Sequence, residues 1–218
     1  MRIEKYIKTV PVGLLILLAL FIGSLFLFGV IIHEVLWENE LEADNQVFGF
    51  MSTYVVNDGL TEFMKFVTYF ASARFLQVAY GVLILFYLLK RKWREAVETA
   101  AIGIGGFVVN YFMKTSFQRV RPPNPMIEGL QNFSFPSGHA TSGFIFYGLL
   151  AYLVWKSGFQ KPYKYLIISL LISFSILIGL SRVYLRVHYA SDVLAGFCIG
   201  FAWLLLSTWL FDYLKSKN

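Results

Sequence analysis

Long stretches without charge constrain this chain more than any other feature of its sequence. The first runs from Thr9 to Ile32, 24 residues with no charged side chain, and follows a basic N-terminal octapeptide. A helix needs about 20 apolar residues to cross the hydrocarbon core of a bilayer, so this run predicts a membrane-spanning helix. It is too long for the apolar core of a signal peptide, and no small-residue cleavage site follows it, so we expect the chain to retain it.

Five further apolar stretches follow, each shorter than 20 residues and bounded by charged or titratable side chains. Each predicts a span that borrows residues beyond its bounding charges. The predicted spans cover about residues 9–32, 72–90, 95–114, 137–156, 164–182 and 190–212. The predicted fold class is therefore all-α, a single domain over residues 1–218 that forms a bundle of six transmembrane helices.

The composition agrees with a membrane protein and excludes the other broad classes. Hydrophobic residues make up 57% of the chain and charged residues only 15%, whereas a soluble domain has about a quarter charged residues. The one cysteine, Cys198, can form no internal disulfide. We interpret the net charge of +6 as the charge of cytoplasmic loops that face anionic membrane lipids. We expect no nucleic-acid partner.

The positions of the lysine and arginine residues predict the orientation of the bundle. If the spans alternate from a cytoplasmic N-terminus, 12 of the 19 basic residues fall on the inner side and seven on the outer side. The positive-inside rule then predicts that both termini lie in the cytoplasm. We expect the protein to reside in the plasma membrane. Residues 34–71 become a long extracytoplasmic connection, which either lies in the membrane interface beside a site or merely links two spans.

Five of the seven outer cations gather at the ends of the third and fifth predicted spans, together with two histidines and one aspartate. These residues are Lys114, Arg119, Arg121, Arg182, Arg186, His139, His188 and Asp192. Charges near the hydrocarbon boundary are costly, usually face the bundle interior and indicate a functional site. The alternative is a set of anchors that extend into the headgroup region. Several guanidinium groups in one pocket suit phosphate, which arginine binds in a bidentate manner.

The tetrapeptide Pro136-Ser137-Gly138-His139 predicts the start of a helix, with Ser137 as its N-cap. The free N–H groups of a helix N-terminus bind anions, and Gly138 allows close approach of a ligand to the backbone. A capped helix without a ligand would show the same pattern, so the tetrapeptide alone leaves both interpretations open.

His188 and Asp192 are four residues apart, so on a continuous helix they would share a face and could form a hydrogen bond. A carboxylate on one imidazole nitrogen fixes the tautomer and makes the other nitrogen a better nucleophile. His139, on a different helix, would then be available for proton transfer to the leaving group. This combination predicts a phosphatase that forms a covalent intermediate.

We expect this site to need no metal and no other cofactor. A zinc site of His139, His188 and Asp192 is the alternative, but the surrounding cations would repel the ion. On the predicted outer side, the acids besides Asp192 are Glu128 and those of segment 34–71, which we expect to be distant. They are too few for a clamp that holds two metal ions.

Three motifs resemble those of the type-2 phosphatidic acid phosphatase superfamily of membrane-integrated lipid phosphatases. The motif K-x6-R-P is matched from Lys114 to Pro122, P-S-G-H by residues 136–139, and S-R-x5-H-x3-D from Ser181 to Asp192. All eleven specified residues occur in the expected order, which makes the match far more specific than one short motif.

The resemblance implies a role for each matched residue. His188 resembles the nucleophile, Asp192 its orienting partner, and His139 the acid that protonates the leaving oxygen and later activates water. The phosphate clamp is implied for Lys114, Arg121 and Arg182, completed by Ser137 and Gly138. Arg119 and Arg186 lie outside the specified positions, where they either bind a second phosphate or headgroup or serve as anchors.

The resemblance further implies a phosphatase that acts on a lipid phosphate or diphosphate at the extracytoplasmic face, with no obligate protein partner. Phosphatidylglycerol phosphate and undecaprenyl diphosphate are the substrates that bacterial members of the family suggest. Two alternatives stay open, a lipid phosphotransferase that uses the same phosphohistidine and a transporter of anionic lipids. Transporters usually place polar sites near the middle of the bilayer, whereas these charges lie at the ends of spans.

Overall fold

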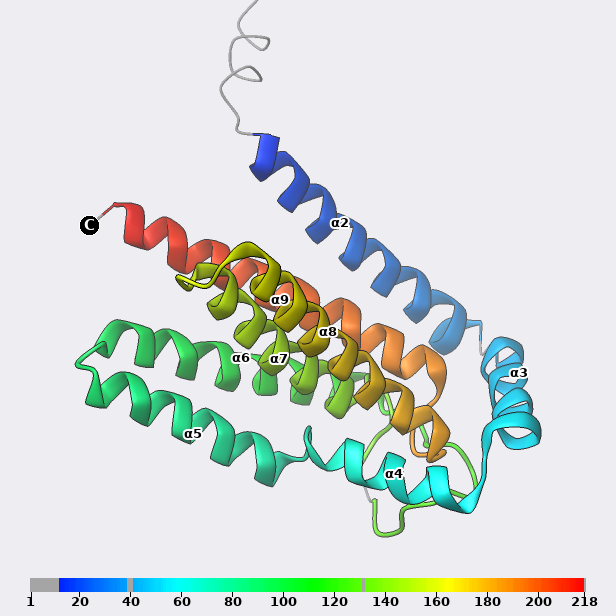
Figure 1. The fold of residues 1–218 in the computed structure, drawn as a ribbon. Helices are drawn as coiled ribbons and strands as arrows, with labels where there is room; N and C mark the ends of the chain where they lie inside the picture. The colour runs from blue at the N-terminus through cyan, green and yellow to red at the C-terminus, as the bar shows by residue number, and fades with distance from the viewer. Residues whose placement is uncertain (1–11, 39–40, 131, 218) are drawn as a thin grey trace, which may run out of the picture.

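The computed structural model describes residues 12–38, 41–130 and 132–217, and the regular structure in these residues is entirely helical (Figure 1). The N-terminal half contains α2 (Val12–Ile32), the π-helical turn η1 (His33–Trp37), α3 (Glu42–Phe50), the π-helical turn η2 (Met51–Val55), α4 (Asp58–Tyr69) and α5 (Ala73–Leu89). The C-terminal half contains α6 (Trp93–Phe117), α7 (Gly138–Lys156), α8 (Lys161–Tyr184) and α9 (Ala190–Ser216). The prediction of an all-α fold is confirmed for the described residues.

Several of these helices are long and apolar enough to cross a membrane. In the described part of the chain they are α2, α6, α8 and α9, and α4 with α5, which meet at a bend of 43°, would add a fifth span. The central helix α7, with 19 residues, does not join this group, because small and polar side chains at its start lower its mean hydropathy. The count of six spans therefore stays a prediction, and residues 9–11 of the first predicted span lie outside the described residues.

Helix α7 occupies the centre of the bundle, where it packs against α6, α8 and α9 (Figure 1). Two glycines of α9 allow the closest approach. A Cβ atom at Gly196 would lie 2.9 Å from the carbonyl oxygen of Ser137, and one at Gly200 would lie 3.0 Å from that of Thr141. These glycines let the first turns of α7 and α9 touch, which brings the P-S-G-H tetrapeptide close to the segment that carries His188.

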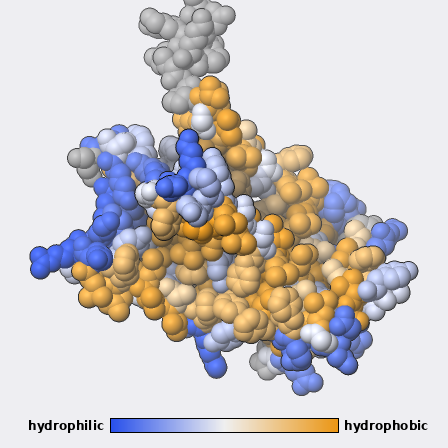
Figure 2. Space-filling view, viewed as in Figure 1, coloured by the Kyte–Doolittle hydropathy of each residue, from blue (hydrophilic) through white to orange (hydrophobic). Residues whose placement is uncertain are grey.

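The outside of the bundle is strongly apolar. Phe26 on α2, Val78 on α5 and Phe107 on α6 are each more than 60% exposed. Figure 2 shows apolar side chains over most of the visible face, with hydrophilic residues gathered towards its edges. Such an extended apolar surface would be a liability in water and is the surface of a protein surrounded by lipid.

The segment 34–71 is a set of helices packed against the bundle, so it does more than link two spans. Asn57 caps α4, because its side chain accepts a hydrogen bond from Leu60 N at 3.0 Å. The buried Tyr184 hydroxyl at the end of α8 donates to the carbonyl oxygen of Asn57 at 3.0 Å. Helix α4 therefore lies against the end of α8 that carries Arg182. Its placement in a membrane interface stays a prediction.

Replacing Gly196 with alanine tests the contact between α7 and α9. The new methyl group would meet the backbone of α7 at 2.9 Å, so the helices must separate, and overpacking of this kind costs about 1–3 kcal/mol. We expect the midpoint of thermal unfolding in detergent to fall for Gly196→Ala.

The matched control is Gly81→Ala on α5, where a Cβ atom would have nothing within 4 Å. Alanine favours a helix over glycine by about 1 kcal/mol, so this variant should keep or raise the midpoint. Equal midpoints for the two variants would contradict the packing described.

Candidate active site

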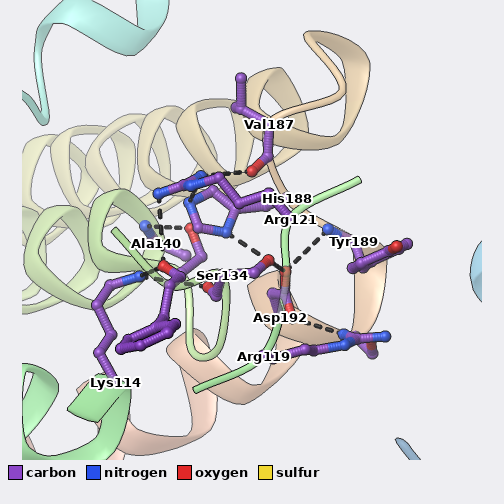
Figure 3. Close-up of polar contacts among 12 residues, drawn as sticks. Lys114, Arg119, Arg121, Ser134, Ala140, Val187, His188, Tyr189 and Asp192 are labelled. Atoms are coloured by element: carbon purple, nitrogen blue, oxygen red, sulfur yellow. Dashed lines mark hydrogen bonds and ion pairs between the residues drawn. The ribbon is translucent and has the colours of Figure 1, made fainter. Parts of the chain in front are cut away.

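The residues singled out in the sequence meet at one end of the bundle, contributed by several separate elements (Figure 3). Lys114 is in the last turn of α6, Arg121 lies in the loop that follows, and Arg182 is in the last turn of α8. Ser137, Gly138 and His139 start α7, His188 lies between α8 and α9, and Asp192 is in the first turn of α9. The structure therefore brings together the eight residues to which the family resemblance assigns a role.

The buried imidazole of His188 lies between the carboxylate of Asp192 and the guanidinium of Arg121. Its Nδ1 is 3.4 Å from Oδ2 of Asp192, and its Nε2 is 3.2 Å from Nη1 of Arg121. A guanidinium can only donate, so Nε2 must accept and the proton must be on Nδ1. The contact with Asp192 was predicted on a continuous helix. Instead α9 begins at Ala190, and His188 precedes it in a turn that folds back onto the first turn of the helix.

Burial determines the charge of His188. The side chain is 2% exposed, and removal from water lowers its pKa to about 3, although the adjacent Asp192 acts in the opposite direction. The imidazole is therefore neutral at physiological pH, with an unprotonated Nε2. Because the unfolded chain binds a proton at a pKa of about 6.5, this group makes the fold less stable as the pH falls from about 6.5 towards 3.

The carboxylate of Asp192 is fully buried and accepts hydrogen bonds from several parts of the chain. Its Oδ1 accepts from Nη1 of Arg119 at 2.6 Å. Its Oδ2 accepts from the Tyr189 backbone N–H at 3.0 Å, from the Ser134 hydroxyl and from His188. This set of donors satisfies the buried charge and fixes the direction in which the carboxylate faces His188.

Two of the predicted clamp residues, Lys114 and Arg121, are held by backbone oxygens. The ammonium group of Lys114 donates to the carbonyl oxygens of Phe133 at 2.6 Å and Ser134 at 3.3 Å. The guanidinium of Arg121 donates to the carbonyl oxygens of Asn132 at 2.9 Å and Val187 at 2.5 Å. Carbonyl oxygens carry no formal charge, so they orient both side chains without forming an ion pair with either.

The third predicted clamp residue, Arg182, is 3% exposed and only partly satisfied. Its Nη1 donates to Oγ1 of Thr68 on α4 at 2.9 Å. Its buried Nε has no hydrogen-bond partner among the described residues. A buried donor without a partner is costly, and a bound anion such as phosphate would satisfy it.

The start of α7 supplies further donors at the same place. Ser137 is the N-cap, as predicted, since its hydroxyl accepts from Ala140 N at 3.5 Å. Asn110 on α6 donates to Thr141 Oγ1 at 3.1 Å, and Thr141 in turn donates to the Ser137 carbonyl oxygen at 3.0 Å. These bonds fix the first turn of α7, whose leading N–H groups have no partner within the helix and suit an anion.

His139 follows in that first turn and is half-buried. It lies within electrostatic reach of Arg182, His188, Arg121 and Lys114. The second histidine therefore shares one site with the first and with the three cations of the predicted clamp.

Arg119 does not bind in the way either sequence interpretation expected. It is buried, with Nη1 on Asp192 and Nη2 on Asp44 Oδ2 at 2.9 Å, and its guanidinium carbon lies 4.0 Å from the centre of the Tyr189 ring. It is therefore neither a second phosphate ligand nor a surface anchor. The expectation that the acids of segment 34–71 are distant is wrong for Asp44, because α3 folds back onto the start of α9. Arg186 is half-buried, and its side chain makes no polar contact with described residues.

The sequence analysis missed several polar residues at the site, among them Asp44, Thr68, Asn110 and Ser134. Asn110 carried a signal, because it is an amide within an otherwise apolar stretch of α6. Asp44 and Thr68 carried none, since the segment that holds them shows no motif and its packing against α8 and α9 is a tertiary effect. Within the described residues no three His, Cys, Asp or Glu side chains are grouped to hold a metal ion.

The chain belongs to the PAP2 superfamily, whose family profile matches residues 97–216. The matched region includes every motif residue described above. Phosphatidylglycerophosphatase B of Bacillus subtilis (strain 168) is 29% identical over 181 residues, which cover 81% of this chain and 88% of that protein.

Two solved structures share the fold. A transmembrane PAP2-type phosphatidylglycerolphosphate phosphatase from Bacillus subtilis superposes with a TM-score of 0.74 at 27% identity, covering 91% of this chain and 96% of the other. Aquifex aeolicus LpxE superposes with a TM-score of 0.56 at 23% identity, covering 75% and 93% of the two chains. The second similarity concerns the fold alone. With the apolar helices, these matches define a multi-pass membrane protein.

The protonation state of His188 can be measured directly. In nitrogen-15 NMR spectra of the histidine-labelled protein in detergent, we expect the His188 imidazole to stay neutral, with the proton on Nδ1, from about pH 5 to pH 8. The physical reason is the lowered pKa of about 3. The His188 signals are identified by their loss in His188→Ala. A titration centred near pH 6.5, or a proton on Nε2, would contradict the geometry.

Proposed function

We propose that this protein is a membrane-embedded lipid phosphatase that hydrolyses a lipid phosphate or diphosphate through a phosphohistidine on His188. One observation carries the proposal. The Nδ1–H of His188 faces the buried Asp192, and its unprotonated Nε2 faces the guanidinium of Arg121. An anion held by Arg121 would be presented to the nucleophilic nitrogen. The Nε of Arg182, which has no hydrogen-bond partner among the described residues, supports an anion in the same place.

In the first step, Nε2 of His188 attacks phosphorus in line with the leaving oxygen. An N–P bond forms, the P–O bond to the lipid breaks, and His139, which enters this step as an imidazolium, donates a proton to the departing oxygen. Lys114, Arg121, Arg182 and the N–H groups at the start of α7 balance the charge on the equatorial oxygens. Asp192 keeps its contact with Nδ1–H and stabilises the positive charge that develops on the ring.

In the second step, the now neutral His139 takes a proton from a water molecule whose oxygen attacks the phosphohistidine. The N–P bond breaks, inorganic phosphate leaves and His188 returns to its neutral state. This scheme uses side chains, backbone N–H groups and water, and it calls for no metal ion.

Phosphatidylglycerol phosphate is the first substrate to test. The similarity to phosphatidylglycerophosphatase B, over 88% of that protein, supports this choice. Undecaprenyl diphosphate is the second, because the same clamp would suit a terminal phosphate on a diphosphate.

The proposal also covers topology, with six spans, both termini in the cytoplasm and the active site at the extracytoplasmic face. The excess of basic residues on the proposed inner side supports this orientation. In right-side-out membrane vesicles, lipid substrate added to the outer leaflet should then be hydrolysed without permeabilisation. A requirement for permeabilisation would contradict the proposed orientation.

Phosphate release by the purified protein tests the proposed reaction. In the presence of EDTA, the wild type should release phosphate from phosphatidylglycerol phosphate, phosphatidic acid or undecaprenyl diphosphate, and far less from glucose 6-phosphate. His188→Ala removes the nucleophile, so we expect the rate to fall by about 1,000-fold or more.

The matched control is His33→Ala, because His33 lies in η1 with half of its side chain exposed and makes no contact with the site. This variant should keep the wild-type rate. Equal rates for the wild type and His188→Ala would exclude His188 as the nucleophile. Loss of activity in EDTA, with recovery on addition of a divalent metal, would contradict the metal-free scheme.

A further inference from the structure

The contact between Asp44 and Arg119 lies behind the proposed nucleophile, on the far side of Asp192. Asp44 is in the first turn of α3, within the segment that carries no sequence motif. Its side chain is nevertheless only 4% exposed. Arg119 is 7% exposed and donates to Asp44 Oδ2 at 2.9 Å and to Asp192 Oδ1 at 2.6 Å. The four residues Asp44, Arg119, Asp192 and His188 therefore form a continuous chain of charged and polar contacts.

The ion pair is held in one geometry by a further set of bonds. Asp44 Oδ1 accepts from the backbone N–H of Ser191 at 3.0 Å, and Oδ2 accepts from the Ser191 hydroxyl at 2.5 Å. Arg119 Nη1 also donates to that hydroxyl at 2.8 Å. The Tyr189 ring covers the guanidinium at 4.0 Å. Both side chains of the pair are thus tied to Ser191 and Tyr189, which are adjacent to Asp192 and His188.

Stability alone is a poor explanation for this arrangement. Burying two carboxylates with one guanidinium leaves a net negative charge away from water, and buried ion pairs often stabilise a fold less than apolar residues of the same size. A helix first turn does favour an acidic residue, but an exposed one would serve that purpose equally well. The arrangement does have a consequence for the proposed reaction, because Arg119 shares its charge between two acids.

We infer that Asp44 and Arg119 are positioning residues for the reaction, which hold the Asp192 carboxylate and regulate how strongly it attracts the Nδ1–H of His188. This inference rests on the proposed function of His188. With Asp44 ionised, only part of the Arg119 charge acts on Asp192, which stays a strong acceptor. Without Asp44, the whole charge would act on Asp192 and weaken its support of the ring as positive charge develops there.

The substitution Asp44→Asn tests the inference, since it removes the charge and keeps the shape. In metal sites, loss of the outer partner that orients a histidine ligand costs about 10- to 100-fold in affinity or activity, and by analogy we expect kcat to fall about tenfold. KM should stay unchanged, because neither Asp44 nor Arg119 is placed at the phosphate. The proton on Nδ1 of His188 should also move upfield in NMR spectra, as its hydrogen bond weakens.

The matched control is Val47→Ala on the same helix, where Val47 packs against an apolar cluster that includes Val183 and Val193. It should lower the unfolding midpoint without changing kcat or the His188 signals, which separates loosening of α3 from loss of the charge. If Asp44→Asn does not fold, Arg119→Lys provides the second variant. The single ammonium group of lysine cannot donate to two carboxylates in the fixed geometry of a guanidinium. We therefore expect the same fall in kcat and the same upfield shift of the His188 proton.

The results separate failure of this inference from failure of the proposed function. An active wild type with unchanged kcat and an unchanged His188 proton signal in Asp44→Asn would overturn the inference alone. An inactive wild type would overturn the proposed function, and the NMR comparison would still decide whether Asp44 acts on His188.

Discussion

The hydrogen bonds of the buried Asp192 carboxylate determine how the rest of this structure is arranged. Its partners come from the loop after α6, the turn before α9 and, through Arg119, from α3. A buried charge with fewer donors would be costly, so each of these segments must fold back to the same end of the bundle. The same hydrogen bonds to Asp192 that position His188 for chemistry also fix the loops around it.

Small residues satisfy the second requirement, close contact between the helices that carry the two halves of the site. Gly196 and Gly200 let α9 approach the backbone of α7, and Ser137 N–H donates to the Asp192 carbonyl oxygen at 3.0 Å. The anion-binding start of α7 and the orienting acid of α9 are thereby joined directly. In lipid, where apolar surfaces gain little by association, packing of small residues and hydrogen bonds between helices supply the driving force that the hydrophobic effect supplies in water.

Much of this could be predicted from the sequence, because apolar runs define helices and the charges between them mark one face. The all-α fold, the N-cap at Ser137 and the gathering of Lys114, Arg182 and His188 follow from local pattern. The role of Arg119 and the contact of Asp44 could not be predicted. Their partners are distant in sequence, at separations of 73 and 147 residues, and nothing local distinguishes a buried acid from an exposed one.

The measurement that tests the central claim most directly is the trapping of the phosphorylated enzyme. The wild type and His139→Asn would be mixed with the best lipid substrate, labelled with phosphorus-32 on the transferred phosphate, and quenched in alkali within milliseconds. The account predicts label on a peptide containing His188, stable in alkali and lost in acid, and greater in His139→Asn if water activation is the slower step. Phosphate release with no labelled protein, or with label on any other residue, would contradict it.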